Sequence, residues 1–202
     1  RGHGESGDGY CTFGLDEAKD ITVVLDAIRN KSGIDSGRIG FYAHSMGSSA
    51  AVRALASEPG LRGYVIDSGY DDLASLLRDV GRTFYGMPGP ITQLGCNAYH
   101  NITGHRPETV SPAAVLRDCP APGLFFHARE DRTIPFARGR ALYEAAAGRK
   151  LFIEVPGDHL AATDEPGYEN KLVEFFRQAF ARPDFDPATA PLSGDAPLSS
   201  KN

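Results

Sequence analysis

Four short runs of apolar residues recur along this chain, and segments with a helical pattern separate them. Each run is short enough for a buried strand and rich in β-branched or aromatic residues. Strands that alternate with helices favour an α/β fold, in which helices cover both faces of a parallel sheet. We expect the strands near residues 39–43, 64–66, 124–127 and 151–155.

Apolar residues recur at helical spacing in several further segments, and glycine or proline ends most of them. The expected helices cover about residues 21–28, 47–56, 73–80, 136–147 and 172–179. Between residues 81 and 112 the pattern breaks down, which predicts irregular structure there.

The length of 202 residues suits one domain with a sizeable core, which we expect to cover residues 1–181. Residues 182–202 differ in composition, with four prolines among small and polar residues. Such a segment buries little apolar surface, so we expect a disordered tail.

Charge and motif content exclude several functions. The net charge is -5 with both signs scattered, so no nucleic-acid partner is expected. No apolar run reaches the ~18 residues of a membrane span. The sequence has no His-x-x-x-His pair, no Cys/His cluster and no phosphate-binding Gly-x-x-x-x-Gly-Lys loop. We therefore expect neither a metal nor a cofactor.

The three cysteines, Cys11, Cys96 and Cys119, lie far apart and match neither a zinc site nor a disulfide framework. We expect free thiols, which fit a reducing compartment and hence a cytoplasmic location. The oligomeric state is left open.

The segment from Ala43 to Gly47 lies where a predicted strand turns into a predicted helix, and Ser45 is at its centre. A serine on such a sharp turn projects its hydroxyl beyond the sheet, as a nucleophile requires. Small residues two before and two after it avoid collisions, and the N–H of Met46 at the helix start is a candidate oxyanion donor. The alternative is that Ser45 caps the helix. Ser48 and Ser49 are expected to pack on the sheet.

A serine nucleophile needs a base, and two later strands end beside suitable residues. Asp131 follows the third strand and His159 follows the fourth, so both fall at the same edge of the sheet as Ser45. Glu130 and Asp158 are alternative carboxylates. The remaining histidines are not expected to take part in the reaction. We expect His3 to have a structural role in the opening loop and His44 and His127 to have packing roles. We expect His100 and His105 to lie at the surface.

Together these motifs resemble the α/β-hydrolase superfamily, especially its dienelactone-hydrolase-like and serine-aminopeptidase-like branches. The resemblance is carried by the Arg-Gly-His-Gly-Glu-Ser loop, the Ala-His-Ser-Met-Gly turn, and the Asp-x-x-Ile-Pro and Gly-x-His segments. It covers about residues 1–181 and implies that Ser45 is the nucleophile, Asp131 the acid and His159 the base. It also implies a cap-like insertion over residues 70–111.

The resemblance implies a serine hydrolase (EC 3.1.1 or 3.4) that cleaves a carboxylic ester or related acyl bond of a small-molecule or peptide substrate through an acyl-enzyme. A peptidase or thioesterase with the same three residues is one alternative. A non-catalytic binding module with a hydrolase fold is another.

The four expected strands match strands five to eight of the family's eight-stranded sheet, and the chain begins at Arg1 in a glycine-rich loop. We therefore expect the C-terminal part of a longer domain. The second oxyanion donor of the family follows its third strand, so it is expected to lie outside these residues. The strand near residue 39 would then be an apolar edge. We accordingly predict that the 202 residues alone are poorly soluble and nearly inactive.

Overall fold

The computed structural model describes residues 1–190 and 192. Its strands form one sheet in which all neighbours are parallel and the spatial order follows the chain. They are β1 (Ile39–His44), β2 (Leu61–Asp67), β3 (Gly123–Ala128) and β4 (Lys150–Val155). The predicted parallel α/β sheet is confirmed. β2 begins earlier than expected, because Leu61 already pairs with Ile39.

Helices follow or precede each strand. They are α1 (Leu15–Arg29), α2 (Met46–Leu55), α3 (Leu73–Thr83), α4 (Gly89–Thr103), α5 (Pro112–Leu116), α6 (Phe136–Ala145) and α7 (Tyr168–Ala181), with short 3-10 helices η1 (Pro107–Thr109) and η2 (Ala161–Asp164). Among the described residues no helix combines the length and apolar character needed to cross a membrane.

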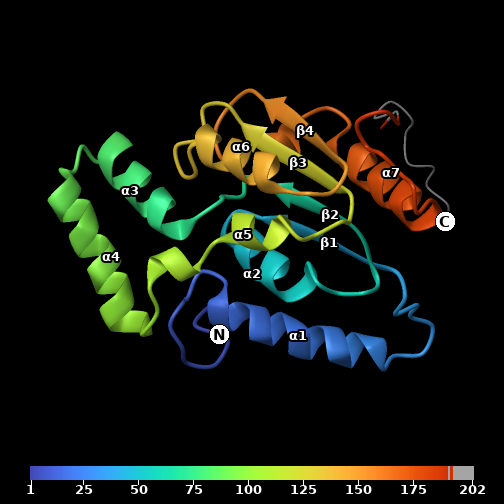
Figure 1. Ribbon diagram of the computed structural model, residues 1–202, viewed down its shortest axis with the longest axis horizontal. Helices are drawn as coiled ribbons and strands as arrows, with labels where there is room; N and C mark the ends of the chain where they lie inside the picture. Colours follow the sequence, from blue (N-terminus) through green and yellow to red (C-terminus); the bar gives the residue numbers. More distant parts are fainter. Residues whose placement is uncertain (191, 193–202) are drawn as a thin grey trace.

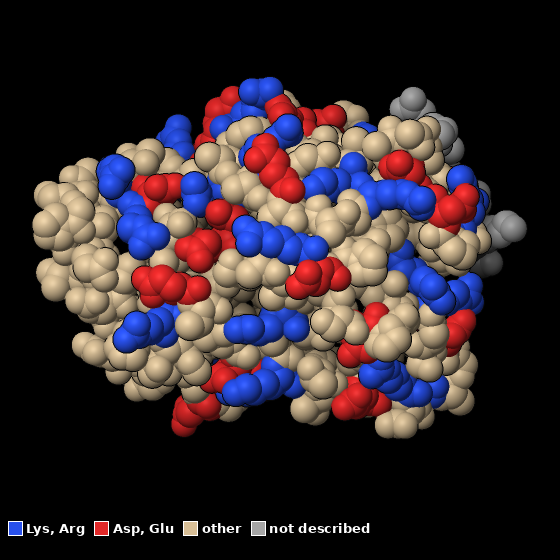
Figure 2. All heavy atoms as spheres, viewed as in Figure 1, with Lys and Arg blue, Asp and Glu red and all other residues tan. Residues whose placement is uncertain are grey.

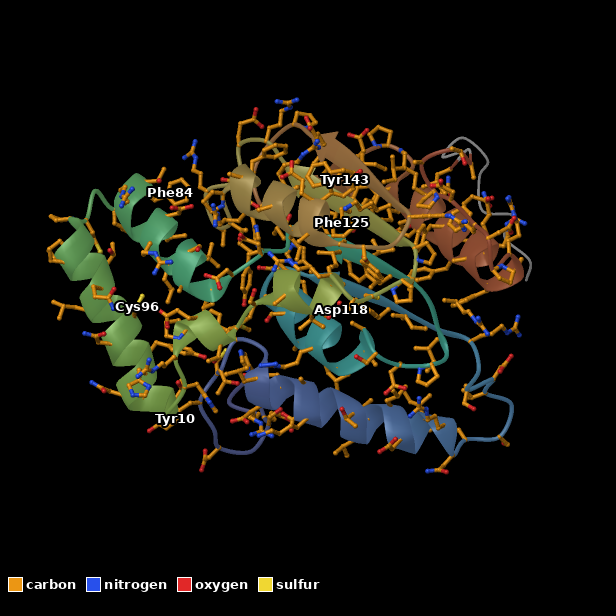
Figure 3. The ribbon with its side chains drawn as sticks, viewed as in Figure 1. Tyr10, Phe84, Cys96, Asp118, Phe125 and Tyr143 are labelled. Atoms are coloured by element: carbon orange, nitrogen blue, oxygen red, sulfur yellow. The ribbon has the colours of Figure 1, made fainter. Side chains whose placement is uncertain are left out.

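The two faces of the sheet bury different side chains, because successive residues of a strand point to opposite sides. On one face Ile66 and Phe125 pack against α2, α5 and α6. On the other, Val65 and Phe126 pack against α7 (Figure 1). Phe125 and Tyr143 of α6 approach edge to face with ring centroids 5.4 Å apart (Figure 3). The sheet is thus the middle layer between these two groups of helices.

Helices α3 and α4 project to one side of the sheet (Figure 1) and lie within the predicted insertion 70–111. They share a small core with the main domain, to which Leu73 and Ile134 contribute. No Lys, Arg, Asp or Glu occurs in α4. The side of the molecule where α4 lies is accordingly uncharged in Figure 2, whereas both signs alternate over the rest of that face.

The expectation of irregular structure over residues 81–112 is wrong, because α4 is a regular helix of 15 residues. Its burial pattern hides it in the sequence: Thr92, Cys96 and Tyr99 are buried, whereas Ile91 and Leu94 are exposed. The aliphatic side chains therefore do not mark the inner face of this helix.

The tail prediction is also wrong for its first part. Phe185 is only 1% exposed and stacks edge to face on Phe175 of α7, with ring centroids 5.6 Å apart. Phe185 anchors this segment together with Ala190 and Leu192, which pack against the same core, and a buried ring removes a large apolar area from water. Residues 191 and 193–202 of the predicted tail lie outside the described part of the chain.

Candidate active site

All four strands deliver a polar residue to the same edge of the sheet. Ser45 directly follows β1, and Ser68 directly follows β2. Asp131 lies in the loop after β3, and His159 lies in the loop after β4. Parallel strands end at a common edge, so four segments far apart in sequence converge there.

Ser45 has an unusual backbone conformation, with φ 53° and ψ -130°. A positive φ is unfavourable for a residue with a Cβ atom, and such strain is concentrated at functional sites. The Ser45 N–H donates to the Asp67 carbonyl at 2.9 Å, which ties the turn to β2. The side chain makes no capping hydrogen bond to α2. Its hydroxyl is therefore free of the capping role considered as the alternative.

The small residues around this turn have different roles. Ala43 is buried at 7% exposure, as the expected contact with the helix requires. Gly47 is exposed, however, and a methyl group built on it meets no atom of the structure within 4 Å. The expectation that position 47 must be small to avoid a collision is thus wrong for the described residues, since an added Cβ atom would meet none of them. Ser48 and Ser49 are buried, and the Ser48 hydroxyl donates to the Ser45 carbonyl at 2.6 Å.

His159 lies between Ser45 and Asp131. Its Nε2 atom is 2.8 Å from Ser45 Oγ, and its Nδ1 atom is 2.7 Å from Asp131 Oδ2. Because a carboxylate only accepts, Nδ1 carries the hydrogen in this bond, which leaves Nε2 to accept from the serine hydroxyl. The structure therefore brings together the three side chains singled out in the sequence.

The carboxylate of Asp131 is completely buried and fixed by its own loop. Oδ1 accepts the backbone N–H groups of Thr133 and Ile134, each at 2.8 Å. Oδ2 remains for His159. Hydrogen bonds of this kind hold a buried carboxylate in one orientation.

The backbone of His159 is fixed as well. Its carbonyl accepts from the Ser68 hydroxyl at 3.2 Å, and its N–H donates to Asp158 at 2.8 Å. Asp158 also accepts the Arg132 N–H, and these two backbone bonds lower the pKa of Asp158. Asp158 therefore joins two loops and does not reach the His159 ring by any described hydrogen bond.

The second alternative carboxylate, Glu130, and the remaining histidines make other contacts. Glu130 accepts the Gly157 N–H at 2.5 Å and so ties the two loops together. His44 packs beside His159, with ring centroids 4.9 Å apart. His3 and His100 are exposed, and His105 is half-buried. His127 is buried behind Asp131.

The sequence reading missed Asp67 and Ser68 at the end of β2. Ser68 is fully buried and shares the positive φ of 53° seen at Ser45. Its hydroxyl also lies 3.0 Å from Asp67, whose other oxygen accepts from the Tyr168 hydroxyl at 2.8 Å. Burial raises the pKa of Tyr168, so this hydroxyl keeps its hydrogen. Their position at the carboxyl end of a parallel strand is the one signal in the sequence that could have identified them.

Met46 is the first residue of α2. Backbone N–H groups in the first turn of a helix have no acceptor within the helix, and the helix dipole favours negative charge beside them. Among the described residues no group of three or more His, Cys, Asp or Glu side chains is arranged to bind a metal.

Comparison with known proteins identifies the architecture. No protein-family model matches the chain. The Bacillus subtilis protein YqkD, itself described as uncharacterized, is 30% identical over 163 residues, which cover 79% of this chain and 53% of that protein. The chain thus spans about half the length of this curated relative.

Solved structures give a closely similar arrangement of elements. Esterase Pf2001 from Pyrococcus furiosus has a TM-score of 0.68 at 20% identity, covering 89% of this chain and 68% of that one. Acylaminoacyl peptidase from Pyrococcus horikoshii has a TM-score of 0.61 at 18% identity, covering 85% and 29%. Acetyl xylan esterase 1 from Thermoanaerobacterium has a TM-score of 0.61 at 14% identity, covering 87% and 60%. These likenesses confirm the expected fold.

Proposed function

From the α/β-hydrolase fold of the chain, we propose that the protein is a serine hydrolase that cleaves a carboxylic ester or related acyl bond. The observation that carries this proposal is the continuous hydrogen-bonded line from Ser45 through His159 to Asp131. Each of its three members comes from a different strand end, and the line ends on a buried carboxylate. A line of this kind has the geometry needed to activate a serine hydroxyl.

In the first half of the reaction, Ser45 Oγ attacks the carbonyl carbon of the substrate while its proton passes to His159 Nε2. The carbonyl electron pair moves onto oxygen, and we assign the Met46 N–H as one donor to this oxyanion. When the carbonyl re-forms, the bond to the leaving group breaks and the leaving group takes the proton from His159. An acyl group then remains on Ser45.

In the second half, a water molecule gives one proton to His159 Nε2 and attacks the acyl carbon. The carbonyl re-forms, Ser45 Oγ leaves with the proton from His159, and the free acid departs. Asp131 accepts the Nδ1–H throughout and stabilises the imidazolium that forms in each half.

Ester, thioester and peptide bonds are all open to this chemistry, and the fold is shared by proteins described as esterases and as acylaminoacyl peptidases. We therefore expect a panel of activated esters, thioesters and acyl-peptides to rank the three classes, with esters cleaved fastest.

A fluorophosphonate probe tests the proposal, because it phosphonylates only a serine that an adjacent base activates. We expect the full-length protein to be labelled and Ser45→Ala to be unlabelled. The exposed Ser36 provides the control, since Ser36→Ala should keep full labelling. Labelling that persists in Ser45→Ala would assign the reactivity to another residue. A folded protein that takes no label would favour a non-catalytic binding module.

A further inference from the structure

A second histidine, His127, lies behind the buried carboxylate and has no part in the reaction described above. It is the fifth residue of β3 and is only 1% exposed. Its Nε2 atom is 2.9 Å from the Ile134 carbonyl oxygen and 3.5 Å from Asp131 Oδ2. The His127 ring therefore touches the loop that carries Asp131 at two points.

The contacts of His127 fix where its hydrogen lies. A carbonyl oxygen can only accept, so Nε2 is the nitrogen that donates to Ile134. Burial lowers the pKa of His127, which keeps the ring neutral and leaves Nδ1 without a hydrogen. The charged or titratable groups around it are Asp131, Asp67 and His159. The ring is thus a directed single donor toward the loop.

Ile134 links the His127 ring to the Asp131 carboxylate through two hydrogen bonds. The Ile134 carbonyl accepts from His127, and the Ile134 N–H donates to Asp131 Oδ1 at 2.8 Å. The His127 ring therefore fixes the Ile134 carbonyl, and the Ile134 N–H in turn fixes the Asp131 carboxylate. Release of the carbonyl would free the turn that orients Asp131.

The fold also makes room for the ring. Gly139 of α6 faces His127, and a Cβ atom built on Gly139 would coincide with the ring at Nδ1. Phe136 packs edge-on against the same ring, with centroids 5.8 Å apart. Only a glycine at position 139 leaves the ring in its present place.

We propose that His127 is a positioning residue, whose Nε2–H fixes the Ile134 loop so that Asp131 Oδ2 meets His159 Nδ1. This inference rests on the proposed hydrolase function, since it concerns the acid of that reaction. It gives His127 a role beyond filling the core.

Two substitutions at this position separate the donor from the space it fills. His127→Gln keeps an N–H near the Nε2 position, whereas His127→Leu fills a similar volume without a donor and leaves the Ile134 carbonyl unpaired. We expect His127→Leu to lower kcat by about tenfold to a hundredfold with KM nearly unchanged, and His127→Gln to stay within about threefold of the wild type.

A second pair of substitutions, in helices α6 and α4, tests the space that the His127 ring occupies. Gly139→Ala should displace the ring and slow the reaction, whereas Gly95→Ala in α4, where a Cβ meets no atom within 4 Å, should leave the rate unchanged. All variants are compared by the second-order rate constant for fluorophosphonate inactivation of the full-length protein. This constant is measured on the reactive molecules alone, so a loss of folded protein does not change it.

An inactivation rate constant for His127→Leu equal to that of the wild type would overturn the inference, as would equal losses in His127→Leu and His127→Gln. Neither result affects the proposed function, which fails separately if the wild type is not labelled or if Ser45→Ala still is.

Discussion

The Nε2 atom of His159 lies 2.8 Å from Ser45 Oγ, although Ser45 follows β1 and His159 follows β4, the two outermost strands of the described sheet. Three strand spacings separate β1 from β4, which is roughly 14 Å. The loop after β4 must therefore reach back across the sheet. On this path His159 touches Asp131 after β3 and Ser68 after β2. His159 is thus in contact with residues that follow all the other strands.

Replacement of Ser45, the proposed nucleophile, should remove almost all activity. In Ser45→Ala the attacking oxygen is lost while the base and its carboxylate remain. We expect kcat for an activated ester to fall on the order of 10⁶-fold, with little change in the melting temperature. Steady-state kinetics and thermal unfolding measure the two quantities. A fall of less than about a hundredfold would contradict the role of Ser45.

The two neighbouring carboxylates after β3 should respond differently. Asp131→Asn keeps the shape but offers an amide to His159 Nδ1, so the ring loses its correct tautomer, and we expect kcat to fall by about 10⁴. Glu130→Gln is the matched control, since its amide oxygen can still accept the Gly157 N–H. The two kcat values are compared on the same ester. An equal loss in both variants would show that Asp131 has no special role.

The stability of the protein should depend on pH through His127. Burial lowers the pKa of His127 below its ordinary value of 6.5, so the unfolded chain takes up a proton first as the pH falls. The resulting stability is present above pH 6.5 and is lost as the pH falls through the lowered pKa. Urea unfolding at about pH 7.5 and about pH 5.5 should therefore show a smaller loss for His127→Gln than for the wild type.

The exposed His100 provides the comparison for this experiment. His100→Gln should lose as much stability on acidification as the wild type. An identical pH dependence of the free energy of unfolding in the wild type and in His127→Gln would contradict the prediction.

The face of the sheet that α6 covers should tolerate truncation poorly. Leu142 is fully buried in this core, so Leu142→Ala creates a cavity and should lower the free energy of unfolding by about 3 kcal/mol. Leu94 on α4 is 64% exposed, and Leu94→Ala should change it by less than about 0.5 kcal/mol. Denaturant titration compares the two. Similar effects at both positions would contradict the assignment of the core.

The sequence predicted the sheet well because each strand contains a short apolar run, and such a run is recognised without knowledge of its partners. It also placed Ser45, Asp131 and His159 at one edge, because the end of a parallel strand is fixed once the strand is known. The contacts of Ser68 with His159 and of His127 with Ile134 depend on how loops fold back across the sheet. No local pattern encodes those paths.

The two wrong predictions, for α4 and for the segment around Phe185, have a common physical cause. Helix α4 buries a threonine, a cysteine and a tyrosine and exposes its aliphatic side chains, so periodicity in hydrophobicity does not reveal it. Phe185 anchors residues whose composition is that of a disordered tail. In both places tertiary contacts decide the structure, and composition gives the opposite indication.

Under the proposed function, the positive φ of Ser45 implies an exchange of stability for activity at position 45. Glycine adopts this conformation freely, whereas a residue with a side chain pays roughly 1–3 kcal/mol for it. For stability alone a glycine would be favoured at position 45, so the proposed role of Ser45 as the nucleophile is what would retain a serine there. In lineages that have lost the activity, position 45 should drift toward glycine while the surrounding sheet stays unchanged. The residue at this position then records whether a descendant still depends on the reaction.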